Sequence, residues 1–251
     1  MKKRSRGGLQ TAFQVSRRTL IVDLGGLRSV LSSAPRAGGI TRARYILNHQ
    51  VSAKPMGRDG RGPGTCVRCP DPARTLSKLA TSLGIRDKFV GLMTAVSLAD
   101  LVTVRETYDQ VWVEGFVTVG TSNAVQAGEP VTPSQRSSSA HPGTINLILV
   151  TNARLSASAM VGMVQVATEA KTAVLMRAKV KSWTGRPGAT GTGTDAVVVV
   201  SGNGPPMKYS GTHTVLGELV GRVIGTAVTA GLARYLRWHG RRTPHHRAKN
   251  L

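Results

Sequence analysis

Apolar runs and helix-like patterns alternate in the second half of the chain. Residues 145–151 (INLILVT) and 196–201 (AVVVVS) are apolar at almost every position, which is typical of strands covered on both faces. Residues 156–180 and 214–238 carry apolar positions at helical spacing, with a Ser or Thr at the start of each segment. Strands that alternate with long helices predict an α/β fold.

The first half of the chain predicts more strands and one helix. Asp71 and Pro72 open this helix, because Asp caps helices and Pro suits the first turn, and we expect it to end at Gly84. Residues 89–96, 101–108 and 111–119 fit neighbouring antiparallel strands joined by short turns. The other predicted strands are 19–24, closed by a turn at Gly25-Gly26, then 28–31 and 44–51.

These elements predict a single α/β (α+β) domain over residues 19–233, with a mixed β-sheet packed by helices and Gly-rich loops at the site. A basic tail over residues 1–18 precedes it. Residues 234–251 hold the end of the last helix and a second basic tail. Residues 52–70 are rich in Gly, Pro and Arg and show no periodicity, so we expect a loop.

Three glycines lie four residues apart in the last predicted helix: Gly217, Gly221 and Gly225. A similar spacing occurs in membrane helix dimers, but Glu218 and Arg222 interrupt this one. We therefore expect the glycines to form a smooth ridge on which another element packs closely inside a soluble core.

The net charge of +22 suggests a nucleic acid or an anionic surface as a partner. Residues 1–18 and 234–251 hold twelve of the positive charges and no acid, so the body keeps a net +10. Such tails are usually solvated. An aromatic content of 4% also leaves few rings for stacking on bases. We expect no nucleic acid as the primary partner.

Residues 16–21 (SRRTLI) are similar to a twin-arginine export signal. Asp23 and Arg28 interrupt the segment that follows, so it is not a clean apolar region and fits a first strand better. No apolar run approaches the roughly 20 residues of a membrane span. We expect a cytoplasmic protein without a membrane partner.

Cys66 and Cys69 are the only cysteines, at a spacing that suits metal ligands. A zinc site needs about four ligands, and no second CxxC or paired histidine lies nearby. A single pair also builds no disulfide framework. We predict no metal site here.

Acidic residues are scarce where the strands and helices of the second half meet. Only Glu129, Glu169, Asp195 and Glu218 lie between residues 118 and 225. Isolated carboxylates in a basic protein are candidates for proton transfer or ligand binding. The alternative is a structural role in ion pairs and helix caps. Lys171 shares the apolar face of its helix, so we expect it to point toward covered surface.

Residues 190–195 (TGTGTD) form a G-x-G-x-x-A pattern together with Ala196, but they precede a strand instead of following one. This excludes a dinucleotide fingerprint, and the Gly-Lys-Ser/Thr of a phosphate-binding loop is also missing. The loop presents hydroxyl and N–H groups that can hold a polar substrate or an oxyanion. His213 lies just before the last helix, whose N-terminus favours the uncharged ring, as suits either a base or a helix-end hydrogen bond.

Seven short segments, in this order along residues 19–233, resemble the adenosylcobinamide amidohydrolases of corrinoid salvage. They are residues 31–39 (LSSAP with GG), 90–95 (VGLMTA), 122–128 (SNA with AG), 143–146 (GTIN), 167–173 (ATEAKTA), 189–195 (ATGTGTD) and 211–218 (GTHT with LGE).

The resemblance implies a hydrolase of a linear carbon–nitrogen bond. Adenosylcobinamide would lose its aminopropanol arm and give adenosylcobyric acid, which re-enters coenzyme B12 synthesis. The corrinoid is then the substrate, and no cofactor is implied. Two alternatives stay open: a corrinoid-binding protein without hydrolysis, and a basic nucleic-acid-binding protein. The insertion at 55–70 and the basic tails depart from the family pattern.

Amide hydrolysis needs a base, donors for the oxyanion and an acid for the leaving amine. We expect His213 or Asp195 to be the base, and Glu169 or Glu218 to orient it or protonate the amine. Lys171, Asn146 and the loop N–H groups around Thr192 are oxyanion candidates. The expected substrate contacts are Asn123, Asn146, Thr190, Thr192, Thr194, Ser210 and Thr212.

Overall fold

The computed structural model describes residues 4–5, 10–51, 71–130 and 143–240. The predicted loop over 52–70, with Cys66 and Cys69, lies outside these residues, as does the end of the C-terminal tail.

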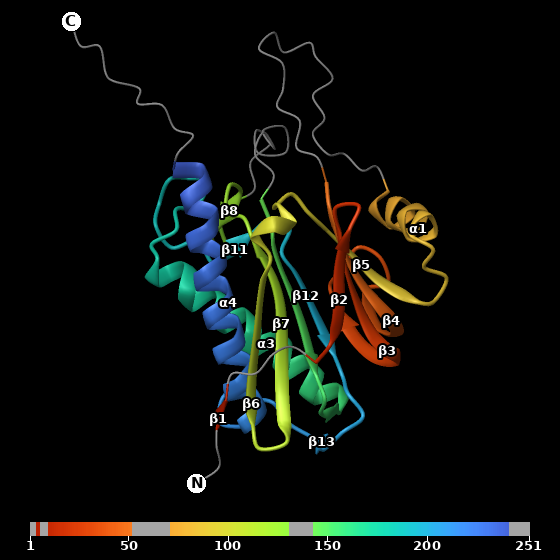
Figure 1. Cartoon of the computed structure of the whole chain (residues 1–251). Coiled ribbons are helices and arrows are strands. Elements are labelled where there is room, and N and C mark those ends of the chain that lie inside the picture. Colours follow the sequence, from red (N-terminus) through yellow and green to blue (C-terminus); the bar gives the residue numbers. More distant parts are fainter. Residues whose placement is uncertain (1–3, 6–9, 52–70, 131–142, 241–251) are drawn as a thin grey trace, which may run out of the picture.

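One mixed sheet of nine strands dominates the fold (Figure 1). Its order is β1-β6-β7-β9-β12-β3-β4-β5, with β2 paired to β3. The strands are β1 (Arg4–Ser5), β2 (Ala12–Ser16), β3 (Thr19–Ser32), β4 (Gly39–Gln50), β5 (Phe89–Thr94), β6 (Val102–Tyr108), β7 (Val111–Val119), β9 (Ile145–Thr151) and β12 (Ala196–Val200).

In the described part of the chain, three α-helices pack on the sheet, and the predicted N-caps of the first two are confirmed. The helices are α1 (Pro72–Ser82), α3 (Ala157–Arg177) and α4 (Val215–Gly240). Asp71 accepts a hydrogen bond from the N–H of Arg74, and Ser156 does the same for Ala159. Two small pairs of strands complete the structure: β8 (Ala124–Val125) with β11 (Gly191–Thr192), and β10 (Arg154–Leu155) with β13 (Pro206–Met207).

The sheet bends so that its two halves share a core. Apolar side chains of β3, β4 and β5 form one buried cluster with Phe116 of β7, Ile148 of β9 and Val198 of β12. On the outer face of β6, β7, β9 and β12, a second cluster receives α3 and α4. Helix α1 covers the opposite layer, over Ile21 and Leu47. Figure 1 shows α1 and the α3–α4 pair on opposite sides of the sheet.

The bend lies in β3, where the predicted strands 19–24 and 28–31 prove to be one continuous strand. The register against β4 shifts between Asp23 and Arg28, so Gly25 and Gly26 form a bulge and not the predicted turn. Gly25 has φ +70, which favours glycine. A bulge bends a strand and increases its twist, and this one lets β3 serve both layers.

A second correction concerns β5. It was expected beside β6 in an antiparallel set, but it pairs with β4 in parallel. Strands β6 and β7 are antiparallel as predicted. The parallel pairing follows the α1 crossover between β4 and β5, which is the type of connection that parallel strands need.

Part of the segment assigned to the N-terminal tail is ordered in the sheet. β1 pairs with β6, and β2 forms a hairpin with β3. Arg17 and Arg18 are the two turn residues of this hairpin, with φ +47 and +58. The buried Glu114 accepts hydrogen bonds from the N–H groups of Gln10 (2.5 Å) and Thr11 (3.0 Å).

Helix α4 is, among the described helices, the one that is long and apolar enough to cross a membrane, and 56% of its most apolar window is buried. Its packing against β6, β7 and α3 accounts for this composition. The glycine ridge is confirmed only at Gly217, where a Cβ would collide with the backbone of Gly211. Gly221 and Gly225 have nothing within 4 Å of that position, so the close packing expected there is wrong.

Candidate functional site

A buried ion pair lies at the N-terminal ends of β9 and β12. Lys171 of α3 donates to the Asp195 carboxylate, with 2.5 Å between Nζ and Oδ2. The two side chains are 8% and 14% exposed. The side chain of Lys171 is therefore buried, as predicted from its position on the apolar face of the helix.

Four donors surround the Asp195 carboxylate. Oδ1 accepts from the N–H of Ile145 at 2.9 Å and from the Thr192 hydroxyl at 2.5 Å. Oδ2 accepts from Lys171 and from the N–H of Thr192 at 3.1 Å. A carboxylate with its acceptor positions filled has no free site for a substrate proton, so this geometry favours Asp195 as a positioning residue over the base expected from the sequence.

Gly191 is what allows the ion pair to sit against the loop. A Cβ at Gly191 would lie 2.5 Å from Asp195 Oδ2 and 2.8 Å from Lys171 Nζ. Glycine is the residue that permits this close approach of backbone to polar groups.

Thr144 directly precedes β9 and was not among the site residues proposed from the sequence. It is 4% exposed. Its Oγ1 lies 2.8 Å from the carbonyl oxygen of Thr194 and 3.3 Å from Asn146 Oδ1. The Thr194 hydroxyl in turn donates to the carbonyl oxygen of Gly143 at 3.0 Å. These bonds join the starts of β9 and β12.

Asn146 connects the two layers of the sheet. Its Nδ2 donates to Asn48 Oδ1 at 2.9 Å and to the carbonyl oxygen of Met93 at 2.8 Å. Asn48 also approaches the Thr118 hydroxyl at 3.4 Å. Both amide hydrogens of Asn146 are thus used, which argues against its expected role as an oxyanion donor. Asn48 lies 98 residues away in the chain, so no local pattern pointed to it.

Asn123 borders the same cluster. Its Oδ1 is buried and, among the described residues, accepts no hydrogen bond. A Cβ at Gly143 would lie 2.6 Å from this oxygen. Buried acceptors usually have a donor partner, so Asn123 is a candidate contact for a substrate N–H or O–H.

Thr190 and Glu129 fasten the neighbouring loops. Thr190 accepts from the N–H of Ala127 at 2.8 Å and, through its carbonyl, from Thr172 at 3.0 Å. The N–H of Gln126, followed by the Ser182 hydroxyl, lowers the pKa of Glu129 below its ordinary value. Glu129 therefore has the structural role that the sequence left as the alternative.

The remaining expected residues lie elsewhere. Ser210, just before α4, donates to the carbonyl oxygen of Ala159 in the first turn of α3 at 2.7 Å. Lys171 is twelve residues further along α3, or about 18 Å at 1.5 Å per residue. His213 is exposed near Ser210. His213 and Asp195, expected as alternative bases, therefore lie near opposite ends of α3 and do not share one site.

Glu169, Thr212 and Glu218 line a separate groove between α3 and α4, with a volume of about 440 Å³. Glu169 is bonded to Gln165 at 3.2 Å. Glu218 lies 3.8 Å from Arg222 on the next turn. Glu169 therefore faces away from Lys171, although only two residues separate them.

Six of the seven family-like segments meet around the charged pair or border it. Residues 90–95 contribute the Met93 carbonyl, and residues 31–39 hold Ser33, which bonds the backbone of Val197. Only the segment at 211–218 lies at the other end of α3. The cluster thus combines a cation, hydroxyls and backbone N–H groups in a largely buried setting, as a hydrolase of polar bonds requires.

The fold and this cluster fit a hydrolase that cleaves an amide bond. The family model described as adenosylcobinamide amidohydrolase matches residues 4–240. The chain belongs to the adenosylcobinamide amidohydrolase family, whose reaction is the hydrolysis of a carbon–nitrogen amide bond.

Two relatives extend this result. The adenosylcobinamide amidohydrolase of Methanosarcina mazei is 31% identical over 88% of this chain and 96% of its own length. An uncharacterized protein of Methanocaldococcus jannaschii is 28% identical over 86% of both chains.

Solved structures of lower similarity also align with the chain. A protein of Pyrococcus horikoshii gives a TM-score of 0.43 at 9% identity, over 89% of this chain and 83% of that one. The L-aminopeptidase D-Ala-esterase/amidase of Ochrobactrum anthropi gives 0.39 at 9% identity, over 96% and 92%.

Proposed function

We propose that this chain hydrolyses the amide that joins aminopropanol to the corrin ring of adenosylcobinamide, with the cluster around Lys171 and Asp195 as the reaction centre. Water adds across the carbon–nitrogen bond, so the carboxylic acid stays on the corrin and aminopropanol leaves as the free amine. The family match supports adenosylcobinamide as the substrate. The buried ion pair supports this cluster as the location of the reaction centre.

Lys171 is the cation of the cluster that can oppose charge on the amide oxygen. The carboxylate of Asp195 accepts hydrogen bonds from Lys171, from Thr192 and from the N–H of Ile145, and so holds these groups in place. Because the pair is largely withdrawn from water, its ammonium stabilises a developing oxyanion more than an exposed lysine would. Lys171 also has further N–H groups that could protonate the leaving amine.

Thr144 is our candidate for the attacking oxygen: its Oγ1 forms an ester with the corrin acyl group while the hydroxyl proton leaves on aminopropanol, and water then hydrolyses this ester and restores the hydroxyl. The hydroxyls of Thr192 and Thr194 are each directed at one acceptor. The Thr144 hydroxyl has two acceptors in reach, so its proton can turn from one to the other. Thr144 also directly precedes Ile145, whose N–H is held by Asp195. The other possible nucleophile is a water activated in the same place.

Mass spectrometry of aminopropanol released from adenosylcobinamide tests the assignment. Lys171→Met is expected to lower turnover by about 100-fold or more, the scale of losing one charge-stabilising group. Thr144→Val should do the same if Thr144 attacks, while Thr144→Ser keeps measurable turnover.

His213→Ala is the matched control, because His213 lies at the other end of α3 and should leave turnover near that of the wild type. Loss of turnover in His213→Ala together with normal rates in Lys171→Met would place the reaction at the start of α4 instead. Binding of the corrinoid without release of aminopropanol would reject hydrolysis.

A further inference from the structure

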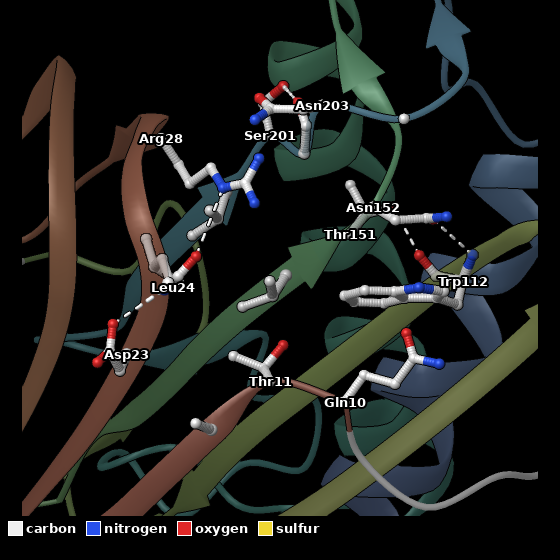
Figure 2. Close-up of a pocket in the computed structure, with 16 residues that line it drawn as sticks. Gln10, Thr11, Asp23, Leu24, Arg28, Trp112, Thr151, Asn152, Ser201 and Asn203 are labelled. Atoms are coloured by element: carbon white, nitrogen blue, oxygen red, sulfur yellow. Dashed lines mark hydrogen bonds between the residues drawn. The ribbon is translucent and has the colours of Figure 1, made fainter.

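A cavity lies at the ends of β9 and β12 opposite the Lys171–Asp195 cluster, where the bend in β3 separates the two layers of the sheet. Its volume is about 440 Å³, within the range of pockets that hold small molecules. Figure 2 shows that the bulge of β3, the end of β9, and residues 201–204 after β12 surround it. Because β9 and β12 are parallel, this is the carboxyl end of a parallel pair, where ligands often bind in α/β sheets.

Arg28 brings a charge into this cavity that no acid of the described chain neutralises. Its Nη1 is buried and makes no hydrogen bond among the described residues. Its Nε reaches only the Leu24 carbonyl oxygen, at 3.5 Å. Figure 2 shows the guanidinium directed from β3 toward Thr151 and Asn152. A buried guanidinium nitrogen without an acceptor lowers the stability of the fold, and a ligand that accepts its hydrogen bond removes this cost.

Asp23 is the other charged residue that lines the cavity. One oxygen of its carboxylate is already engaged, since Oδ1 accepts from the N–H of Gly25 at 2.9 Å and from Arg44 at 3.5 Å. Arg44 is also paired with Asp87 at 3.0 Å. Asp23 therefore leaves Arg28 available, but its negative charge disfavours a ligand with two negative charges.

The walls around Arg28 combine apolar side chains with uncharged polar ones, among them Gln10, Thr11 and Asn203. Leu24, Val150, Val200 and Trp112 contribute apolar surface. Asn152 has both ends of its amide occupied, by the N–H of Trp112 at 3.0 Å and the carbonyl oxygen of Gln110 at 2.7 Å. An arginine with a buried, unsatisfied Nη1 beside apolar side chains suits a ligand with one anionic group and an apolar body.

We propose that this cavity binds a small organic monocarboxylate, with its carboxylate on Arg28 and its apolar part against Val150, Val200 and Trp112. Arginine matches a carboxylate through two parallel N–H···O bonds. Strand β9 separates the cavity from the Lys171–Asp195 cluster by seven residues, or about 23 Å. The site is thus independent of the proposed hydrolysis and takes a different ligand.

Titration calorimetry on the full chain tests this with three probes: benzoate, its neutral isostere benzamide, and inorganic phosphate. We expect saturable binding of benzoate. Benzamide should bind at least about tenfold more weakly, a margin typical of losing a charged hydrogen bond. Phosphate should also bind more weakly than benzoate. Arg28→Gln should weaken benzoate binding at least about tenfold as well. Arg177→Gln, an exposed arginine on α3, should leave it unchanged.

Equal binding of benzoate and benzamide would overturn the proposal, and that comparison needs no variant. Tighter binding of phosphate than of benzoate would reject the monocarboxylate. Undiminished benzoate binding in a folded Arg28→Gln protein would place the ligand elsewhere.

Discussion

Gly191 shows how one missing side chain supports the charged pair. Alanine at this position would place its Cβ within 2.8 Å of both Lys171 Nζ and Asp195 Oδ2. We expect Gly191→Ala to displace the pair and lower turnover of adenosylcobinamide by about 100-fold, because small displacements at a reaction centre are costly. Turnover and circular dichroism would be measured together.

Gly193→Ala is the matched control, two residues further along the same loop. Nothing lies within 4 Å of its Cβ position, so this variant should keep near-normal turnover. Similar rates for the two variants would show that the pair tolerates displacement, and would count against the cluster as the reaction centre.

His49 is expected to make stability depend on pH. Burial lowers the pKa of His49 below its ordinary 6.5, and the Arg18 guanidinium lowers it further. The unfolded chain therefore takes up this proton at a higher pH than the folded chain does. The His49 contribution to stability is complete above about pH 6.5 and is lost as the pH falls toward the lowered pKa.

Urea midpoints at about pH 7.5 and pH 5 would measure this effect, with His49→Gln for comparison. The wild type should lose more stability than the variant between the two conditions. The same loss in both proteins would assign the pH dependence to other groups.

Helix α4 contains glycines with opposite expected responses to alanine. Gly225 has open space at its Cβ position, whereas at Gly231 a Cβ would lie 2.7 Å from Val119 of β7. Gly225→Ala should raise the free energy of unfolding by about 0.5–1 kcal/mol, the helix propensity difference. Gly231→Ala should lower it by about 1–3 kcal/mol through overpacking. Thermal or urea unfolding would measure both. A destabilised Gly225→Ala variant would show that the space at the Gly225 Cβ position cannot accept a methyl group.

Sequence patterns predicted the buried strands, the long helices and their caps because these depend on neighbouring residues. They did not predict the single β3, since a Gly-Gly pair looks the same in a turn as in a bulge. Nor did they place β5, because strand order depends on contacts between residues far apart in the chain.

The same distinction explains how much of the site could be predicted. Lys171 and Asp195 stand beside strong local signals, a helix face and a strand start. His213 and Glu169 also look chemically suited, yet the fold places them at another end or face of the helices. Thr144 and Asn48 were missed because their role comes from hydrogen bonds between strands. The cytoplasmic location stays a prediction.

At the scale of the whole molecule, the bond between Asn48 and Asn146 joins the two layers. Asn48→Ala would leave an Asn146 N–H without its acceptor in a buried position. We expect a loss of about 2 kcal/mol with a single cooperative urea transition retained, because both layers share one core. Asn203→Ala, at an exposed position, should change stability by less than about 0.5 kcal/mol. Two separate transitions in either variant would show that the layers fold independently.

The bulge in β3 has a consequence for the length of this strand. Neighbouring side chains of a strand point to opposite faces, so removing Gly25 or Gly26 alone would invert the parity of one half relative to the other. The side chains of Leu20 and Val22 would then point to the face of the sheet that Thr19 and Ile21 now occupy, and Thr19 and Ile21 would point to the other face. Natural variants of this strand are therefore expected to keep its residue count between Asp23 and Arg28, or to change it by even numbers.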